Sequence, residues 1–177
     1  MQQYSASVYG HEMIAIRPAD ASDATVLGEI HAAAWEAAYG RFFEPDFVAR
    51  SVQSRRTRWS ERLAHDDGTI LIAALDGRPL AFAWSRPSAT RPGLAEIFSF
   101  YGHPDGWGSG IATELMSETL RFLHDDGFTR VHLWTLRDTP QARRFYTKCG
   151  FVATGATQPH DYGDGTPLEQ VEYERAC

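Results

Sequence analysis

The chain has 177 residues, 43% of them hydrophobic, which suits one domain with a substantial core and is too short for two domains of ordinary size. The formal net charge of −6 argues against a nucleic-acid surface, which needs clustered lysine and arginine, and favours a cationic small-molecule partner. Two cysteines indicate no disulfide framework or metal-ligand motif, and no apolar run reaches the ~18 residues of a membrane helix, so we expect a cytoplasmic protein without metal or membrane contacts.

The N-terminal part of the chain predicts a tail, a strand and a helix. We expect residues 1–12 to be a flexible tail and residues 13–177 to form the single domain. Residues 13–17 alternate in polarity and are followed by Pro18, as is typical of a short strand. Apolar side chains then recur at helical spacing until a stop near Gly40.

A second helical region begins near Asp46 and extends toward Leu63. Residues 51–58 are polar enough to interrupt it. We expect its basic side chains to form a solvated face rather than a phosphate-binding patch. These side chains belong to Arg55, Arg56, Arg58 and Arg62.

Two apolar runs in the middle of the chain predict a β-hairpin. Residues 69–75 and 80–84 have the composition of strands, and the Asp76-Gly77 dipeptide between them is a strong hairpin signal. Residues 85–93 are polar and contain proline and glycine, which predicts a turn leading into the next strand.

The central segment predicts a strand, a glycine-rich loop and a helix. Residues 97–101 form a short apolar and aromatic run, and apolar residues recur at helical spacing from Ile111 to Leu123. Glycines allow close approach of a ligand to the main chain, and the first turn of a helix carries unpaired amides that bind anions. A phosphate site is therefore plausible, although such a turn is more often an ordinary connection. The glycines are Gly102, Gly106, Gly108 and Gly110.

The last third of the chain predicts strands around a short helix. Thr139 stands at the N-cap position before Pro140, and Gly150 stands where a helix ends. The alternation of strands and helices from the central segment onward requires a parallel strand pair. We expect strands over residues 131–136, from 151 to 154 and over 168–174, with a loop over 158–167.

The residues around the glycine loop discriminate among phosphate-binding motifs. A P-loop places Lys and then Ser or Thr after its last glycine, whereas Gly110 is followed by Ile111 and Ala112. A dinucleotide-binding fingerprint needs a final glycine that is missing here. The segment from Trp107 to Ala112 instead resembles the pyrophosphate-binding loop of the GNAT superfamily of acyl-CoA-dependent N-acetyltransferases, with Trp107 in place of the usual Arg or Gln.

A second segment, Arg130 to Phe151, resembles the later part of the same superfamily: a strand, a short helix with an aromatic pair, and a Gly-Phe ending. Thr139 stands where relatives often have Asn. The resemblance spans Ile14 to Arg175 and implies an α/β fold. Its sheet would be mixed and mostly antiparallel, with six to seven strands, a parallel central pair and about four flanking helices.

The resemblance implies acetyl-CoA as co-substrate and assigns residues to hold it. The pyrophosphate would lie on the amides at the start of the helix, and the thioester carbonyl would accept from a main-chain amide near Tyr101 or Gly102. The implied cofactor-binding residues are Phe100, Tyr101, Gly102, Trp107, Gly108, Ser109, Gly110, Ile111, Ala112, Thr113, Thr139 and Arg143.

Two residues are candidates for proton transfer. Glu96 lies six residues before Gly102, where some superfamily members place the general base, and the alternative is that it pairs with an arginine or faces solvent. Tyr146 stands where relatives have the tyrosine that protonates the departing thiolate, and the alternative is a buried tyrosine with a satisfied hydroxyl. His103 and His132 have no partner at metal-ligand spacing and are expected to be structural.

The expected reaction is direct acetyl transfer to the primary amine of a small molecule, in a ternary complex. Candidate acceptor contacts are Trp35, Tyr39, Trp84 and Tyr162. A protein N-terminus or lysine remains an alternative acceptor, as do a non-catalytic acyl-CoA sensor and a nucleotide binder. An exposed final strand would support a homodimer.

Overall fold

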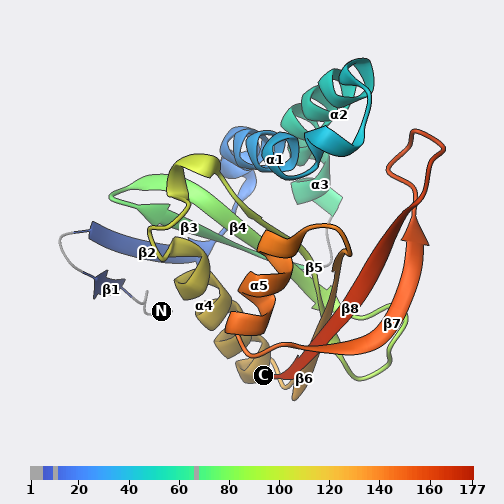
Figure 1. Ribbon diagram of the computed structural model, residues 1–177. Helices are drawn as coiled ribbons and strands as arrows, with labels where there is room; N and C mark the ends of the chain where they lie inside the picture. The colour runs from blue at the N-terminus through green and yellow to red at the C-terminus, as the bar shows by residue number, and fades with distance from the viewer. Residues whose placement is uncertain (1–5, 10–11, 66–67) are drawn as a thin grey trace. The chain divides into compact units, whose positions relative to one another are not determined.

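The computed structural model describes residues 6–9, 12–65 and 68–177 (Figure 1). The described chain folds as two compact units that interleave in sequence. The first unit takes the residues up to Ser85 together with Ser99–Thr119, and the second takes Arg86–Phe98 and Leu120–Cys177. The expectation of a single domain stays a prediction, and each unit is described by itself.

The sheet of the first unit is antiparallel. Strand β1 (Ala6–Tyr9) pairs with β2 (Glu12–Pro18), which pairs with β3 (Thr69–Leu75), which pairs with β4 (Arg78–Pro87). Part of the segment expected as a tail therefore forms β1, while residues 1–5 and 10–11 lie outside the described residues.

The predicted hairpin between β3 and β4 is confirmed. Asp76 and Gly77 both have positive φ, 49° and 82°, as a two-residue turn of type I′ requires. Asp76 also accepts a hydrogen bond through Oδ1 from the amide of Met13, 2.9 Å away, so the turn is tied to strand β2.

Three helices belong to the first unit: α1 (Ala24–Tyr39), α2 (Pro45–Thr57) and α3 (Trp59–His65). The predicted second helical region is interrupted at Arg58, as its polarity allowed. The prediction of a solvated arginine face is wrong. Arg55 is buried, Arg58 and Arg62 are half-buried, and only Arg56 is exposed.

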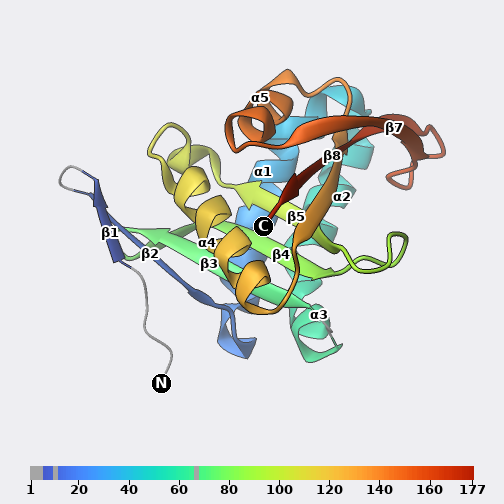
Figure 2. The same ribbon diagram turned by 90° about the horizontal axis from the view of Figure 1, so that it is seen from below.

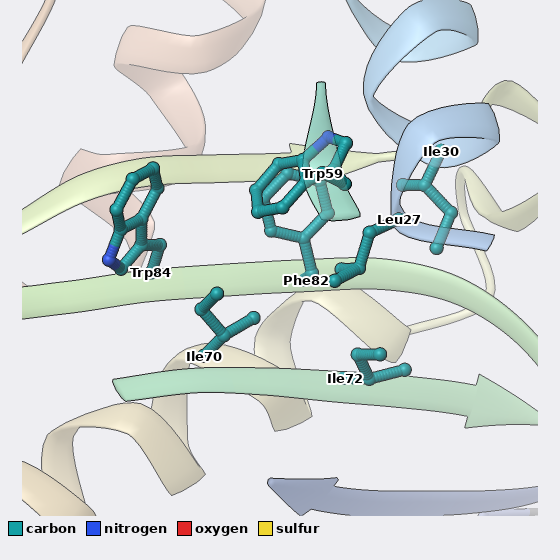
Figure 3. Close-up of a cluster of buried hydrophobic side chains, with 7 residues drawn as sticks. All are labelled: Leu27, Ile30, Trp59, Ile70, Ile72, Phe82 and Trp84. Carbon is teal, nitrogen blue, oxygen red and sulfur yellow. The ribbon is translucent and has the colours of Figure 1, made fainter. Parts of the chain in front are cut away.

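The core of the first unit lies between helices α1 and α3 and one face of β3 and β4 (Figure 3). Trp59 of α3 lies over Phe82 of β4, with 5.0 Å between the ring centroids. Burying such side chains contributes about 1.5–3 kcal/mol each. The cluster consists of Leu27, Ile30, Trp59, Ile70, Ile72, Phe82 and Trp84.

The second unit contains a parallel strand pair and a long antiparallel ribbon. The start of β5 (Ala95–Gly102) pairs in parallel with β6 (Arg130–Leu136), as predicted. Strand β6 pairs antiparallel with β8 (Leu168–Ala176), and β7 (Val152–His160) runs beside β8 in both Figure 1 and Figure 2. The predicted loop over 158–167 is therefore too long, because residues 158–160 pair with β8.

Two further helices complete the chain. Helix α4 (Ile111–Asp125) follows the glycine loop, and α5 (Pro140–Lys148) begins at the predicted proline. The predicted fold class, mixed and mostly antiparallel α/β with a parallel pair, is confirmed. The described residues contain eight strands and five α-helices, more than predicted, because β1 was not expected and the second helical region is two helices. None of these described helices combines the length and the apolar character that crossing a membrane requires.

Helices α1 and α2 approach each other closely at Gly28. A Cβ atom at this position would lie 2.1 Å from the backbone oxygen of Arg56, which no real side chain tolerates. Gly40, at the end of α1, differs, because an added Cβ would meet Val48 at an ordinary 3.8 Å. The glycine at position 28 is therefore required by packing and not by backbone conformation.

We predict that Gly28→Ala destabilises the protein by about 1–3 kcal/mol, because the overpacking forces the helices apart and outweighs the gain in helix propensity. Gly40→Ala is the matched control and should be neutral or stabilising by about 0.5 kcal/mol. Urea unfolding followed by circular dichroism measures both. Equal stabilities of the two variants would contradict the close approach of α1 to α2.

Candidate functional site

The glycine loop of the first unit presents an open stretch of main chain. Gly108 and Gly110 have φ angles of 80° and 87°, and a Cβ atom added to either would meet nothing within 4 Å. Glycine is favoured at such angles because larger residues are strained there. The space that a side chain would fill is open to a ligand.

Several amides of this loop point to no protein acceptor. Within the described part of the chain, the main-chain N–H groups of Gly108, Gly110 and Ala112 donate no hydrogen bond to protein. The amides of Thr113 and Glu114, by contrast, close onto the carbonyl of Gly110. Unpaired amides at the start of a helix form an anion site, since the helix dipole adds to their partial positive charge.

Contacts within the first unit fix the shape of this loop. Trp107, whose side chain is 48% exposed, donates from Nε1 to the carbonyl of Gly102 at 3.0 Å. The hydroxyl of Ser109 donates to the carbonyl of Gly106 at 2.7 Å. His103 caps the 3₁₀ turn η3 (Pro104–Gly106) by accepting from the amide of Asp105, which gives this histidine a structural position.

Helix α5 of the second unit carries two of the predicted residues, Arg143 and Tyr146. Tyr146 is buried, and its ring contacts the rings of Phe151 and Tyr173. Arg143 donates from Nε to the hydroxyl of Tyr173 at 3.1 Å and from Nη1 to the carbonyl of Arg137, so two of its donors are engaged within the protein.

Thr139 occupies the predicted N-cap position of α5, but its side chain does not cap the helix. Its hydroxyl donates to the carbonyl of Leu136 at 2.6 Å instead. The prediction of a threonine cap is thus right about the position and wrong about the hydrogen bond. The hydroxyl proton of Thr139 is therefore used in a hydrogen bond to the last residue of strand β6.

Glu96 lies on β5, in parallel register with His132 of β6. The neighbours Ala95 and Ile97 are buried, whereas Glu96 is half-buried and Phe98 exposed, as expected from the alternation of faces along a strand. The strand therefore presents Glu96 on the face opposite to Ala95 and Ile97.

A buried polar network surrounds His132. Its Nε2 lies 2.7 Å from the hydroxyl of Ser88, and its Nδ1 lies 2.9 Å from Oε1 of Glu172 outside hydrogen-bond alignment. Arg91 bridges Glu172 and Glu174 at 3.0 and 2.5 Å. The network ties the turn before β5 to strands β6 and β8.

The candidate acceptor contacts fall in both units. In the first unit, Trp35 is fully buried and stacked on Phe43, and Trp84 belongs to the core cluster. Tyr39 contacts Trp35 with 6.0 Å between ring centroids. Tyr162, in the second unit, contacts His160 with 4.5 Å between ring centroids.

The structure also groups residues that the sequence did not single out. His31 of α1 is buried, with its ring 4.5 Å from that of Tyr101 and 5.6 Å from that of Trp59. Burial, together with the charges of Arg58, Arg55 and Arg62, lowers the pKa of His31 to about 2. The helical spacing of His31 to Trp35 was a usable signal, but the arginines that face them come from another helix.

The chain is similar in sequence to a known protein family and to named relatives. The family model described as Acetyltransferase (GNAT) family matches residues 29–151. A mycothiol acetyltransferase of Nocardiopsis dassonvillei is 32% identical over 127 residues, which cover 67% of this chain and 38% of the relative. A mycothiol acetyltransferase of Sanguibacter keddieii is 29% identical over 147 residues, covering 81% of this chain and 44% of the relative. The chain therefore spans less than half the length of these relatives.

Solved structures resemble the fold over nearly the whole chain. The PaiA N-acetyltransferase of Thermoplasma acidophilum, crystallised with coenzyme A, has a TM-score of 0.71 and 19% identity and covers 93% of this chain and 99% of its own. A GCN5-related N-acetyltransferase of Rhodopseudomonas palustris has a TM-score of 0.71 and 22% identity over 92% of this chain and 94% of its own. At these identities the likeness establishes the fold.

We predict that His31 causes the free energy of unfolding to decrease as the pH is lowered. Its folded-state pKa lies below the unfolded value of about 6.5, so the unfolded chain binds one proton more between pH 6.5 and about 2. Its stabilising contribution is therefore complete above pH 6.5 and falls by about 1.4 kcal/mol per pH unit below it. Urea unfolding measured from pH 6.5 to 4.5 gives the change in unfolding free energy per pH unit. This change should be smaller in His31→Gln than in the wild type by about 1.4 kcal/mol per pH unit, which corresponds to one proton. Equal slopes would contradict the buried neutral imidazole.

Proposed function

Because the chain belongs to the GNAT family of acetyltransferases, we propose that it transfers an acetyl group from acetyl-CoA to the primary amine of a small molecule, by direct attack in a ternary complex. The observation that carries the proposal is the open glycine loop at the start of α4, with its unpaired amides and positive-φ glycines. When bound, acetyl-CoA supplies the thioester that is the acyl donor.

The loop fits the pyrophosphate of that donor. The amides of Gly108, Gly110 and Ala112 are donors without protein acceptors among the described residues, and the missing Cβ atoms leave room for phosphate oxygens. Trp107 supplies no side-chain donor, because its Nε1 is bonded to Gly102. We infer that main-chain groups hold the pyrophosphate and that Thr113, in the first turn of α4, is placed to add a hydroxyl.

The remaining roles concern proton transfer. A primary amine must lose a proton to attack, and we propose Glu96 as the group that accepts it. The departing thiolate must gain a proton, and we propose that the hydroxyl of Tyr146 donates it. Main-chain amides near Tyr101 and Gly102 are proposed to stabilise negative charge on the carbonyl oxygen.

The raised pKa values of the two cysteine thiols support direct transfer of the acetyl group. Burial raises the pKa of the Cys149 thiol and that of the Cys177 thiol. The thiolate is the nucleophilic form of cysteine, so a raised pKa disfavours a covalent acetyl-cysteine. The name of the relatives, mycothiol acetyltransferase, supports a small-molecule acceptor over a protein N-terminus or lysine.

We predict that Gly110→Ala weakens CoA binding at least tenfold, because the added methyl group occupies the space proposed for a phosphate. Gly127→Ala is the matched control: Gly127 has a φ of 94° and an added Cβ would also meet nothing, so the backbone strain of about 1 kcal/mol is shared. Isothermal titration calorimetry with CoA measures the difference. Equal affinities of the two variants for CoA would show that the glycine loop is not part of the CoA site.

We predict that Tyr146→Phe lowers kcat by roughly 10²-fold or more with a small change in KM for acetyl-CoA, because an acid acts in the transition state. Tyr173→Phe, which removes a hydroxyl already bonded to Arg143, should change kcat far less. The measurement is thiol release with acetyl-CoA over a panel of small amines.

In the same assay, Glu96→Gln should abolish the rise of kcat/KM with pH, since the variant has no carboxylate to accept a proton. CoA binding without turnover on any amine would favour an acyl-CoA sensor. Turnover on peptides alone would favour a protein acceptor. Unchanged kinetics of both Tyr146→Phe and Glu96→Gln would overturn the assigned roles.

A further inference from the structure

Three side chains of the second unit follow one another as a hydroxyl, an imidazole and a carboxylate. The Oγ atom of Ser88 lies 2.7 Å from Nε2 of His132, and Nδ1 of the same ring lies 2.9 Å from Oε1 of Glu172. Ser88 stands in the turn before β5, whereas His132 and Glu172 belong to β6 and β8, which run side by side (Figures 1 and 2). A nucleophile, a base and a group that orients the base stand in this order in enzymes that activate a hydroxyl.

Solvent exposure decreases along these three residues. Ser88 is half-buried, and its neighbours Pro87 and Ala89 are exposed. His132 is fully buried, and Glu172 is 4% exposed. The serine is therefore the member of the three that a small molecule from solvent can approach, while the imidazole and the carboxylate interact in a shielded region where their attraction is strong.

Protein donors hold the carboxylate of Glu172 in one orientation. Its Oε1 accepts from Nη1 of Arg91 at 3.0 Å, and its Oε2 accepts from the hydroxyl of Thr154 at 2.7 Å. Oε1 is thereby kept beside Nδ1 of His132, although this contact is outside hydrogen-bond alignment. Its effect is an attraction between charges, which is greatest when His132 carries a second proton.

Main-chain donors converge on the hydroxyl oxygen of Ser88. The amide of Arg91 donates to Oγ at 3.1 Å and the amide of Thr90 at 3.4 Å. The turn that presents these amides is closed by a hydrogen bond from the amide of Ser88 to the carbonyl of Leu94. Because Oγ accepts from the amides, its own proton is available for Nε2 of His132, which places the ring proton on Nδ1. Amides in this position stabilise negative charge that develops on or beside Oγ.

From this arrangement we propose that Ser88 is a nucleophile, with His132 as its general base and Glu172 as the positioning residue, and that the protein hydrolyses small acyl esters. An exposed turn offers little binding energy, so the substrates are esters with good leaving groups, such as aryl esters. This activity goes beyond the acetyl transfer to an amine proposed above. It also gives His132 a role in place of the structural one expected from the sequence.

The reaction proceeds in two balanced steps. Oγ of Ser88 attacks the ester carbonyl and its proton passes to Nε2 of His132, so that an Oγ–C bond forms and the bond from carbon to the leaving oxygen breaks. The leaving oxygen takes the proton from Nε2. Water then attacks the acyl-serine, His132 accepts a proton from it and returns that proton to Oγ, and the carboxylic acid is released. The net reaction converts ester and water into acid and alcohol.

The first test uses the full chain without CoA and p-nitrophenyl acetate as substrate. Release of p-nitrophenolate is followed by absorbance, and the protein is trapped in acid and mapped by mass spectrometry. We expect an acetyl group on Ser88, and we expect phenylmethylsulfonyl fluoride to modify the same residue and abolish the activity. Mapping the wild-type protein does not depend on the folding of any variant. Absence of both adducts from Ser88 would overturn the proposal.

Variants separate a nucleophile from a hydroxyl that only satisfies the imidazole. Ser88→Ala should lower kcat/KM for p-nitrophenyl acetate at least tenfold. Ser117→Ala is the matched control, because Ser117 is an exposed serine on α4. Circular dichroism confirms that each variant is folded. An unchanged kcat/KM in folded Ser88→Ala would contradict the assignment of the nucleophile.

Histidine variants test the base. Surface imidazoles cleave activated esters on their own, so His132→Gln is compared with His124→Gln, whose side chain is 67% exposed on α4. The first should lose at least tenfold in kcat/KM and the second should not. If Ser88 and His132 act as a unit, Ser88→Ala combined with His132→Gln is no slower than either alone. Multiplying losses would show that they act separately and would overturn the proposal.

The result is independent of the proposed acetyl transfer, because the ester assay contains neither CoA nor an amine. Ester hydrolysis that is lost in Ser88→Ala, together with no turnover of acetyl-CoA on any amine, would support this inference and overturn the proposed function. Turnover of acetyl-CoA on an amine that is unchanged in Ser88→Ala, without ester hydrolysis at Ser88, would overturn this inference alone.

Discussion

The close approach of helices α1 and α2 at Gly28 is the constraint on which the first unit depends. Because position 28 has no side chain, the backbone carbonyl of Arg56 reaches the surface of α1. The residue before it, Arg55, then lies over the indole of Trp35, one helical turn beyond His31 on α1. A guanidinium held on an indole away from water gains about 2 kcal/mol, which offsets part of the cost of burying its charge.

The glycine loop differs from the contact between α1 and α2, because the donors it offers to a ligand are main-chain atoms alone. Where the family pattern has Arg or Gln, this chain has Trp107. Its indole N–H donates a hydrogen bond to the carbonyl of Gly102 at the end of β5. That hydrogen bond anchors the loop without adding a donor for a ligand. The proposed anion binding would then depend on the amides that Gly108 and Gly110 leave open, so the loss of a side-chain donor is compatible with the proposed site.

Much of the fold follows from short-range signals. The Asp76-Gly77 turn, the glycine loop before α4 and the proline at the start of α5 each act through local backbone preferences, and the structure has all three where the sequence predicted them. The extension of β7 through residue 160 was missed, because polar residues and Pro159 resemble a loop while the pairing with β8 is set at long range. The packing of Arg55 and Arg62 against aromatic rings was missed for a related reason. Hydropathy treats arginine as solvated, whereas its partners Trp35 and Trp84 come from α1 and β4.

The net charge of the chain and the local arrangement at the glycine loop lead to opposite expectations for the charge of a ligand. The excess of six negative charges acts over the whole surface and is screened by salt beyond about 8–10 Å. A ligand held at van der Waals distance responds to the groups it touches, and the glycine loop of the first unit offers main-chain amides without protein acceptors among the described residues. Such amides favour anions through their dipoles, in spite of the net negative charge of the chain. Because these donors are main-chain groups, the anion preference proposed for the loop depends on its backbone conformation more than on any one side chain.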